Sequence, residues 1–507
     1  MLPLVLLYVV TSFFFRMKMP DPKATSGQRP SKRVKSCTQE KGPDLQTCAL
    51  LKYSLKLPQS FTPGSIQANR IALRVAGDSC LVYIANAQHV YEVHLGSDLS
   101  AARSSSSGDV DQGKEGVLVP RSAQVGHIRQ LETLSHMAAE VQGLYAGTHG
   151  SHHVLAAVDS VGNVRLLASS MAAPPSGEEG SPGEHQLMTL DAPYRGECGW
   201  TGLAVRSVGL AADRGAADVG DAPTEGPQLE VAVARQRMRD VLLYRNGVRL
   251  RILHTMQGPT ALAYLGSAGP EASGGLLAVA EEHQISLWDV SQGERGGCMQ
   301  RLGVYGGGCP VYGLTWISTA AAAEGRSRQQ GGGSGDEGLL AATGGERSVV
   351  MLEPRKWHIV AKWPGCVKYP ATHMSPSALA PGYVYVAGLD YECVAGRWDG
   401  SSGSCSGNAN SSSGGHGRAM GPAHLIPGRE QQPQADDGLE GVTCGRGGLS
   451  FRGDSKWLGL ACCSLPPLNQ AVGRNGGTDG GSREVAAALS LSGNLYVMLV
   501  APAPPVA

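Results

Sequence analysis

The sequence predicts an all-β protein built from repeated hairpin units, and three observations support this fold class. First, residues 274–289 contain a small-residue start, a short apolar run, a polar turn, a second apolar run and a Trp-Asp ending. Second, the same order returns in degraded form at residues 338–353 and 382–399. Third, each apolar run is too short for a helix and is typical of a buried strand, while each polar break is typical of a hairpin turn.

Repeats of this length that end in Trp-Asp resemble the WD-repeat family. The resemblance implies a β-propeller in which each repeat forms one four-stranded blade. Seven groups of strand-like segments occur along the chain, so the expected fold is a seven-bladed WD-repeat-like β-propeller. The expected units are residues 70–95, 126–168, 200–256, 259–301, 310–363, 366–400 and 448–500.

The resemblance also assigns structural positions within the blades. A His that follows Gly matches the Gly-His pair of the family, and an Asp before a Gly-Asn turn matches the Asp that accepts backbone N–H bonds there. Two Trp-Asp pairs match strand ends. In the family these residues form hydrogen bonds within a blade, so the resemblance implies a structural and not a catalytic role. The positions in this sequence are His127, Asp159, Trp288, Asp289, Trp398 and Asp399.

Internal features of the units agree with this organisation. Asn246-Gly247 separates two apolar runs of the third unit and is a strong type I′ hairpin signal. Residues 492–497 of the last unit echo residues 161–166 of the second, so two distant units share a turn and its following strand. Residues 49–57 alternate as a strand but precede the first unit. We expect them to complete the last blade and so to close the ring.

Long stretches between the strands are rich in Gly, Ser, Ala and Glu, and burial of their few apolar side chains could not offset the entropy of ordering them. We expect disordered insertions there. Without them each unit retains about 45–55 residues, close to the period of four-stranded blades. The insertions are expected near residues 97–116, 172–184, 211–226, 320–338, 401–438 and 468–483.

Composition narrows the partner classes. The 507 residues include 43 Lys and Arg against 43 Asp and Glu, so no net charge draws the chain to nucleic acid or to an anionic membrane. The 12 cysteines contain no Cys-x-x-Cys pair, which gives no support to zinc-ribbon or thioredoxin-like sites. We expect most of them to be small buried side chains in a reducing compartment.

The first 47 residues are expected to be a separate, disordered tail before a single propeller over residues 48–501. Residues 2–15 are apolar, and residues 16–35 carry seven basic side chains against one acid. The apolar run has three interpretations: a mis-assigned translation start, a targeting segment, or an anchor, the one case in which a membrane partner is expected. The basic cluster is typical of a nuclear-import tag or of a solvated tail. The expected compartment is the nucleus or cytoplasm, with export left open.

The sequence contains only weak matches to catalytic and ligand-binding motifs. Residues 108–115 nearly match a phosphate-binding loop, but Glu115 stands where the magnesium-binding hydroxyl is needed. His149, His152 and His153 lie together and could bind zinc, yet exposed histidines of a loop between strands account for them better. No nucleophile elbow occurs. We therefore predict no catalytic, cofactor-binding or metal-binding residues, and no cofactor.

The function expected from these features is a non-catalytic scaffold that holds other proteins in a multiprotein complex. Trp200, Tyr312, Trp357 and Tyr369 are candidate contact anchors, although each could instead pack in the core. One alternative is a substrate receptor of a cullin-type ubiquitin ligase, docked through Glu353 and Arg355 of a degenerate Trp-Asp-x-Arg motif. A second alternative is an exported propeller enzyme or sugar-binding module.

Overall fold

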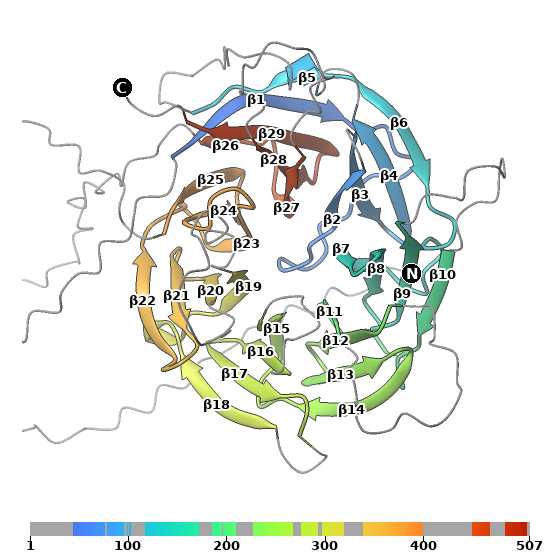
Figure 1. Cartoon of the computed structure of the whole chain (residues 1–507), viewed down its shortest axis with the longest axis vertical. Helices are drawn as coiled ribbons and strands as arrows, with labels where there is room; N and C mark the ends of the chain where they lie inside the picture. Colours follow the sequence, from blue (N-terminus) through green and yellow to red (C-terminus); the bar gives the residue numbers. More distant parts are fainter. Residues whose placement is uncertain are drawn as a thin grey trace, which may run out of the picture. The chain divides into compact units, whose positions relative to one another are not determined.

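The described residues form seven β-sheets arranged around a central axis (Figure 1). This computed structural model confirms the predicted fold class, an all-β seven-bladed propeller. It describes residues 44–76, 79–95, 99, 101–102, 117–171, 185–194, 196–208, 227–266, 275–292, 297–318, 338–398, 449–466 and 482–503. Most of the predicted tail therefore lies outside the described residues, and its last three residues, 45–47, belong to the first strand.

Blades 1 to 6 are antiparallel sheets whose strands run outward from the axis in chain order, and blade 2 is typical. Its strands are β7 (Val141–His149), β8 (His152–Asp159), β9 (Val164–Ser170) and β10 (His185–Leu190). The strands of blades 1 and 3 are β2 (Ile71–Ala76), β3 (Ser79–Asn86), β4 (His89–Leu95) and β6 (Val125–Gln130), then β11 (Thr201–Ser207), β12 (Leu229–Arg235), β13 (Asp240–Arg245) and β14 (Val248–His254).

Blades 4 to 6 repeat the pattern, with a short 3-10 turn (Gly306–Gly308) before blade 5, whereas blade 7 has five strands, two of them from the start of the chain. Blades 4 and 5 contain β15 (Pro259–Tyr264), β16 (Leu276–Glu281), β17 (Gln284–Asp289), β18 (Cys298–Gly303), β19 (Val311–Ser318), β20 (Gly338–Gly344), β21 (Val349–Glu353) and β22 (His358–Trp363). Blades 6 and 7 contain β23 (Ala371–Pro376), β24 (Tyr383–Gly388), β25 (Glu392–Arg397), β26 (Ser450–Arg452), β27 (Trp457–Leu465), β28 (Arg483–Ser490), β29 (Asn494–Pro502), β1 (Leu45–Ser54) and β5 (Arg121–Ala123).

Three of the predicted unit boundaries were wrong, each at an outermost strand. Residues 125–130 are the outer strand of blade 1 and not the start of blade 2. Likewise, residues 450–452 are the outer strand of blade 6 and not the start of blade 7. Residues 185–190 close blade 2 and were left without a unit. In each case a long connection separates the outer strand from its partner, so sequence proximity gave no guide to the pairing.

Side chains from neighbouring blades interdigitate to form the core. Both faces of each sheet are covered, which explains why the inner strands are rich in apolar residues: all seven residues of β12 are buried, and five of them are apolar. Val241 and Leu243 of blade 3, for example, pack with Leu277 and Val279 of blade 4. Each such buried side chain contributes roughly 1.5–3 kcal/mol, so the ring is held mainly by its blade-to-blade interfaces.

The ring closes through a strand from the other end of the chain. β1 pairs antiparallel with β29 from Leu45↔Pro502 to Ser54↔Asn494, which confirms the predicted closure by residues 49–57, although the strand begins earlier. Side chains of β1 serve both neighbouring interfaces. Leu50 packs toward blade 6, whereas Leu51 and Tyr53 pack toward blade 1.

Residues 117–130 form a strap across three consecutive blades. Leu118 donates its N–H to the carbonyl of Ser450 in blade 6 at 2.8 Å. β5 then runs parallel to β1 of blade 7, and β6 becomes the outer strand of blade 1. In Figure 1 this segment follows the outside of the ring over the closure strand. The strap therefore reinforces the ring where its two ends meet.

Residues 58–70, here called the channel segment, link β1 to β2 and reach toward the centre of the ring (Figure 1). Asn69 forms a bridge with Gly143 of blade 2 and accepts the N–H of Leu460 in blade 7 at 3.1 Å. The carbonyl of Ala68 accepts a hydrogen bond from His373 Nε2 of blade 6 at 2.9 Å. A single connection thus contacts the inner strands of three blades.

The channel segment predicts a pH dependence of stability. His373 is buried, and burial lowers the pKa of its imidazole from 6.5 to about 4. Between pH 6.5 and pH 4 the unfolded chain binds the proton and the folded chain does not, so stability falls as the pH decreases and levels off below pH 4. The loss is about 3 kcal/mol. Urea unfolding should show a shallower decline across this window for His373→Gln than for the wild type; equal declines would contradict the account.

Candidate functional site

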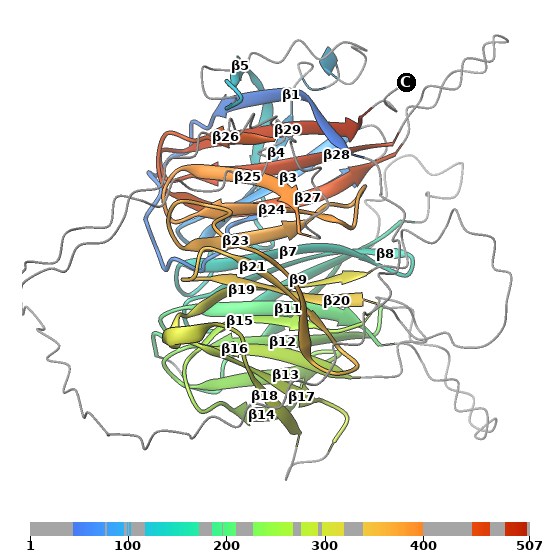
Figure 2. The ribbon, with the colours of Figure 1, turned by 90° about the vertical axis from the view of Figure 1, so that its left-hand side faces the viewer.

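The connections between strands gather on two faces of the ring, because all strands run across its thickness (Figure 2). One face, here called the turn face, carries the connections between blades and those between the second and third strands of a blade. The opposite face carries the other connections, and we call it the insertion face. Apart from the gap at position 195, the gaps between the described ranges interrupt connections whose flanking strand ends lie at the insertion face. Five of the six predicted insertions fall on those stretches except for their last residues, such as Gly338, which begins a strand. The sixth, residues 97–116, includes the described residues Leu99, Ala101 and Ala102, and Leu99 is buried in the core.

Buried polar side chains hold the turn face in place, and Asp159 is the clearest case. It ends β8 and is fully buried. Its Oδ1 accepts the N–H groups of Val161, Gly162 and Asn163 at 3.0, 2.9 and 2.9 Å, and its Oδ2 accepts from the Asn163 side chain at 3.0 Å. Gly162 has a φ of 96°, a conformation that favours glycine. Asp159 therefore occupies the turn-capping role that the family resemblance implied.

Blade 3 uses an ion pair at the same place. Arg235 ends β12 and Asp240 begins β13, and both are buried. The guanidinium binds the carboxylate through two bonds, Nε–Oδ1 at 2.8 Å and Nη2–Oδ2 at 2.5 Å. Such a two-pronged pair fixes the relative position of both strand ends. The turn of residues 236–239 between them is consequently rigid at its base.

Three large hydrophobic side chains are exposed around that turn, and we call them the blade-3 patch: Tyr194, Met238 and Met256. Their exposed fractions are 64%, 37% and 62%. The three connections that carry them are joined by backbone hydrogen bonds, since Arg237 N donates to Cys198 O and Thr255 N donates to Arg239 O, each at 2.9 Å. The three side chains are therefore carried by turns that the backbone holds together.

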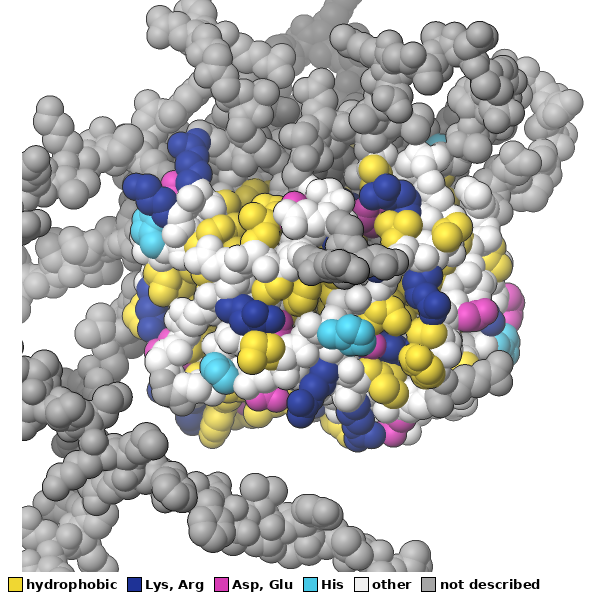
Figure 3. Space-filling model, turned by 90° about the horizontal axis from the view of Figure 1, so that it is seen from below, with side chains coloured by type: hydrophobic (Ala, Val, Ile, Leu, Met, Phe, Trp, Pro, Cys, Tyr) yellow, Lys and Arg dark blue, Asp and Glu magenta, His cyan; other side chains and the backbone are white. Residues whose placement is uncertain are grey.

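The outer rim of the ring differs from this patch. Val248 and Met299 are 66% and 60% exposed on the outer strands β14 and β18. Figure 3, which views the ring from this side, shows hydrophobic side chains interspersed with Lys, Arg and His across the surface. Hydrophobic side chains scattered in this way are normal for a protein surface and do not mark a site.

The tryptophans of the two Trp-Asp pairs, which were predicted to be structural, lie in the core. Trp288 is 6% exposed between blades 3 and 4, and its Nε1 donates to Ser286 Oγ at 2.8 Å. Trp398 is 8% exposed between blades 5 and 6, and its Nε1 donates to the carbonyl of Pro381 at 2.8 Å. Both side chains are structural.

The aspartates of the two Trp-Asp pairs have different positions. Asp289 is partly exposed and accepts the N–H and hydroxyl of Ser291 at 2.9 and 2.6 Å, and these hydrogen bonds lower its pKa. It therefore caps the turn that follows its strand. Asp399 lies outside the described residues.

The structure corrects the role expected of His127. Its predicted position was a Gly-His pair at the start of a blade, with hydrogen bonds inside that blade. Instead, His127 is exposed in the outer strand β6, opposite His94, with ring centroids 6.0 Å apart. The Gly-His pair therefore lies in an outer strand, where it has no capping function.

The predicted docking residues lie at the hairpin between β21 and β22. Leu352 is 2% exposed, so the position of the motif's aromatic residue is filled by a core side chain. Glu353 Oε2 lies 3.3 Å from His358 Nδ1. Arg355 is exposed in the turn on the insertion face, with a contact of its own. Trp357 of the same turn donates its N–H to the carbonyl of Glu353 at 2.7 Å, so the aromatic residue of this hairpin follows the acid and does not stand at the motif's position before it.

The three clustered histidines are not alike. His149 is 3% exposed, bonded to the Tyr145 hydroxyl at 2.8 Å and to Ser207 Oγ at 3.1 Å, and burial lowers its pKa. The expectation that it is an exposed loop histidine was wrong. His152 and His153 begin β8. Among the described residues, no group of three His, Cys, Asp or Glu side chains is arranged to hold a metal ion.

Other expectations concern cysteines and candidate anchors. The nine described cysteines are free thiols; Cys366 and Cys393 are buried, and burial raises the pKa of each to about 12.

Of the candidate anchors, Trp200 is a core residue and Tyr369 is 47% exposed on the turn face. No helix among the described residues is long and apolar enough to cross a membrane. The blade-3 patch was missed, although Met238 inside a polar turn, between two arginines, was a usable signal.

Removal of the Asp159 side chain that caps this turn should cause a measurable loss of stability. Asp159→Ala would leave three backbone N–H groups without their acceptor, at a cost on the order of 3 kcal/mol. Asp159→Asn keeps a carbonyl oxygen in place and should cost about 1 kcal/mol. Urea unfolding of both variants measures these differences. A loss below about 0.5 kcal/mol for Asp159→Ala would show that the turn does not need its cap.

Comparisons with known proteins give no match in sequence and distant similarities in structure. No protein-family model matches the chain, and no curated protein matches its sequence. The chain is similar to the solved structure of Raptor from Chaetomium thermophilum, at 9% identity and a TM-score of 0.47 over 91% of this chain and 29% of that one. It is also similar to a chain of the mitotic checkpoint complex, at 9% identity and a TM-score of 0.44 over 94% and 98% of the two chains. This chain thus spans less than a third of Raptor.

Proposed function

We propose that the protein is a diverged WD-repeat propeller that acts as a non-catalytic scaffold, and that it binds a partner protein through the blade-3 patch. The observation that carries the proposal is the exposure of three large hydrophobic side chains on turns joined by backbone hydrogen bonds. The compartment proposed is the nucleus or cytoplasm.

The chemistry of the patch suits protein binding. Tyrosine and methionine are enriched at interfaces, tyrosine because it buries a large area with few torsions and methionine because it adapts to irregular surfaces. Exposed charges lie on the same turns, where Arg237 and Glu197 pair at 3.5 Å. An apolar centre with a polar rim is the usual anatomy of an interface.

Preorganisation supports the same proposal. The patch stands on the buried Arg235–Asp240 pair and on Cys198, which is fully buried. A partner therefore binds turns that are already ordered, and little entropy is lost on binding. A propeller adds several other connection ends on the same face, so more than one protein can be held at once.

The two alternatives have weaker support. A ligase adaptor site would rest on Glu353 and Arg355, where a buried Leu352 replaces the aromatic residue. An exported enzyme or sugar-binding module would need a catalytic or ligand-binding group, and the sequence offers no named candidate for one. Neither alternative uses the blade-3 patch.

Substitution of the patch tests the proposal. Tyr194→Ala combined with Met256→Ser should reduce recovery of the main partners at least tenfold in a quantitative affinity pull-down, because hot-spot side chains contribute roughly 1–2 kcal/mol or more each. Unfolding stability should remain within about 0.5 kcal/mol of the wild type, since both side chains are exposed.

Met299→Ser combined with Val248→Ser is the matched control. It removes two hydrophobic side chains of similar exposure from the rim and should leave recovery unchanged. Equal loss in both double variants would refute a specific role for the patch. Recovery of a cullin adaptor that Arg355→Ala abolishes would instead favour the ligase alternative.

A further inference from the structure

A groove lies between blades 1 and 2, away from the blade-3 patch. Its volume is about 430 Å³, and its walls come from strands β2, β3, β4 and β6 of one blade and β7, β8 and β9 of the next. Cavities of this size are typical of ligand sites. The blade 1–2 interface thus encloses a space that apolar side chains do not fill.

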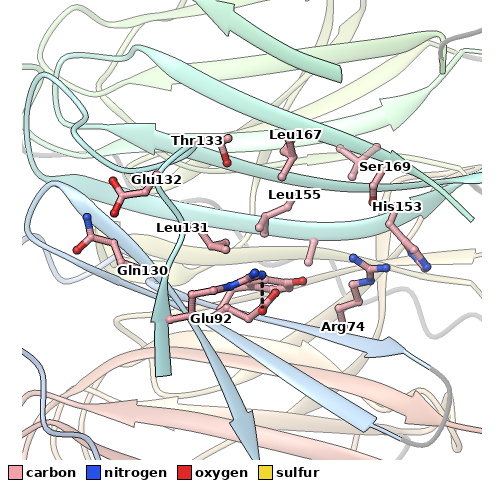
Figure 4. Close-up of a pocket in the computed structure, with 14 residues that line it drawn as sticks. Arg74, Glu92, Gln130, Leu131, Glu132, Thr133, His153, Leu155, Leu167 and Ser169 are labelled. Atoms are coloured by element: carbon pink, nitrogen blue, oxygen red, sulfur yellow. Dashed lines mark hydrogen bonds and ion pairs between the residues drawn. The ribbon is translucent and has the colours of Figure 1, made fainter. Parts of the chain in front are cut away.

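The groove has an apolar middle and polar ends. Figure 4 shows Leu155 and Leu167 between the two ends, with Arg74 and His153 at one end and Glu132 at the other. Leu155 belongs to the core cluster of this interface, so the middle of the groove is firmly supported. A ligand that fits must therefore combine an apolar group with polar ends.

One ion pair inside the groove is already satisfied. Glu92 is buried, and its Oε1 binds Arg129 Nη2 at 2.8 Å and His94 Nε2 at 2.9 Å. Arg129 is therefore committed to Glu92. At the other end Glu132 Oε2 lies 3.2 Å from His136 Nε2. Neither acid forms an ion pair with Arg74 among the described residues.

Arg74 is different, because no described carboxylate pairs with it. Its Nε is buried and lacks a hydrogen-bond partner among the described residues. Its guanidinium lies near the Tyr83 hydroxyl and near His153, neither of which is an anion at neutral pH. A partly buried guanidinium without an acid is a place where an incoming carboxylate gains a charge-assisted bond.

We propose that this groove binds an acidic linear peptide of a partner protein, with an Asp or Glu carboxylate on Arg74 and a neighbouring apolar side chain on Leu155 and Leu167. The site is separate from the blade-3 patch and does not depend on the function proposed for it. An extended peptide fits because the groove places its anion-binding end and its apolar middle in sequence along one cavity.

A carboxylate suits the site better than a phosphate. Burial, together with the charge of Arg74, lowers the pKa of His153 and so disfavours its charged form. Arg74 then supplies one positive charge, which matches the single charge of a carboxylate. A phosphorylated side chain carries close to two charges and would leave one of them uncompensated.

Peptide selection on the full chain tests the proposal. A displayed library of random 12-residue peptides should yield sequences with an acid at a fixed distance from a large apolar residue. In fluorescence anisotropy, changing that acid to its amide should raise the Kd at least tenfold. Arg74→Met, which keeps the length of the side chain, should raise the Kd equally and abolish the difference between the acid and amide peptides.

Further variants test whether the peptide binds in the groove itself. Ser169→Trp fills the groove while Arg74 remains, and it should also abolish binding. Arg249→Met, an exposed arginine on the rim, should have no effect, and neither should the blade-3 double variant; thermal melts verify that each variant is folded. Selected peptides without an acid, an unchanged Kd for Arg74→Met, or tighter binding of a phosphoserine peptide would each overturn the proposal.

Discussion

Closure of the ring by β1 is the constraint on which the rest of the structure depends. A propeller blade has two apolar faces, and every blade covers those faces with its two neighbours. Without β1, blade 7 would lack its fourth strand, and the interfaces with blades 6 and 1 would lose Leu50, Leu51 and Tyr53. Fully burying side chains of this size contributes roughly 1.5–3 kcal/mol each, and the strand adds a ladder of hydrogen bonds to β29.

Two other segments reinforce the same junction. The strap of residues 117–130 binds blades 6, 7 and 1 from the outside, and the channel segment contacts blades 2, 6 and 7 from the inside. Both segments come from the first part of the chain. Segments from the start of the chain therefore bind blades 6 and 7, which come from its end. The two ends of the ring stabilise each other in this way.

Sequence patterns identified the inner strands well, because buried strands are apolar runs that local composition reveals. The closure strand was also predictable, since residues 49–57 alternate and lie outside any unit. Outer strands were not predictable in the same way: 125–130 and 450–452 pair with strands across long connections, and their exposed side chains give weak patterns. Arg74 and the blade-3 patch depend on how neighbouring blades and turns pack, which no local pattern encodes.

The two proposed binding surfaces rely on the closed ring in different ways. The blade-3 patch needs only three adjacent connections, whereas the groove exists only while blades 1 and 2 keep their spacing. Hydrogen exchange followed by mass spectrometry tests the central claim that closure governs the whole ring. The β1 amides bonded to β29 should exchange as slowly as those of β16 on the far side, through global unfolding alone. Rapid exchange in β1 while β16 stays protected would show that the ring holds without its closure strand.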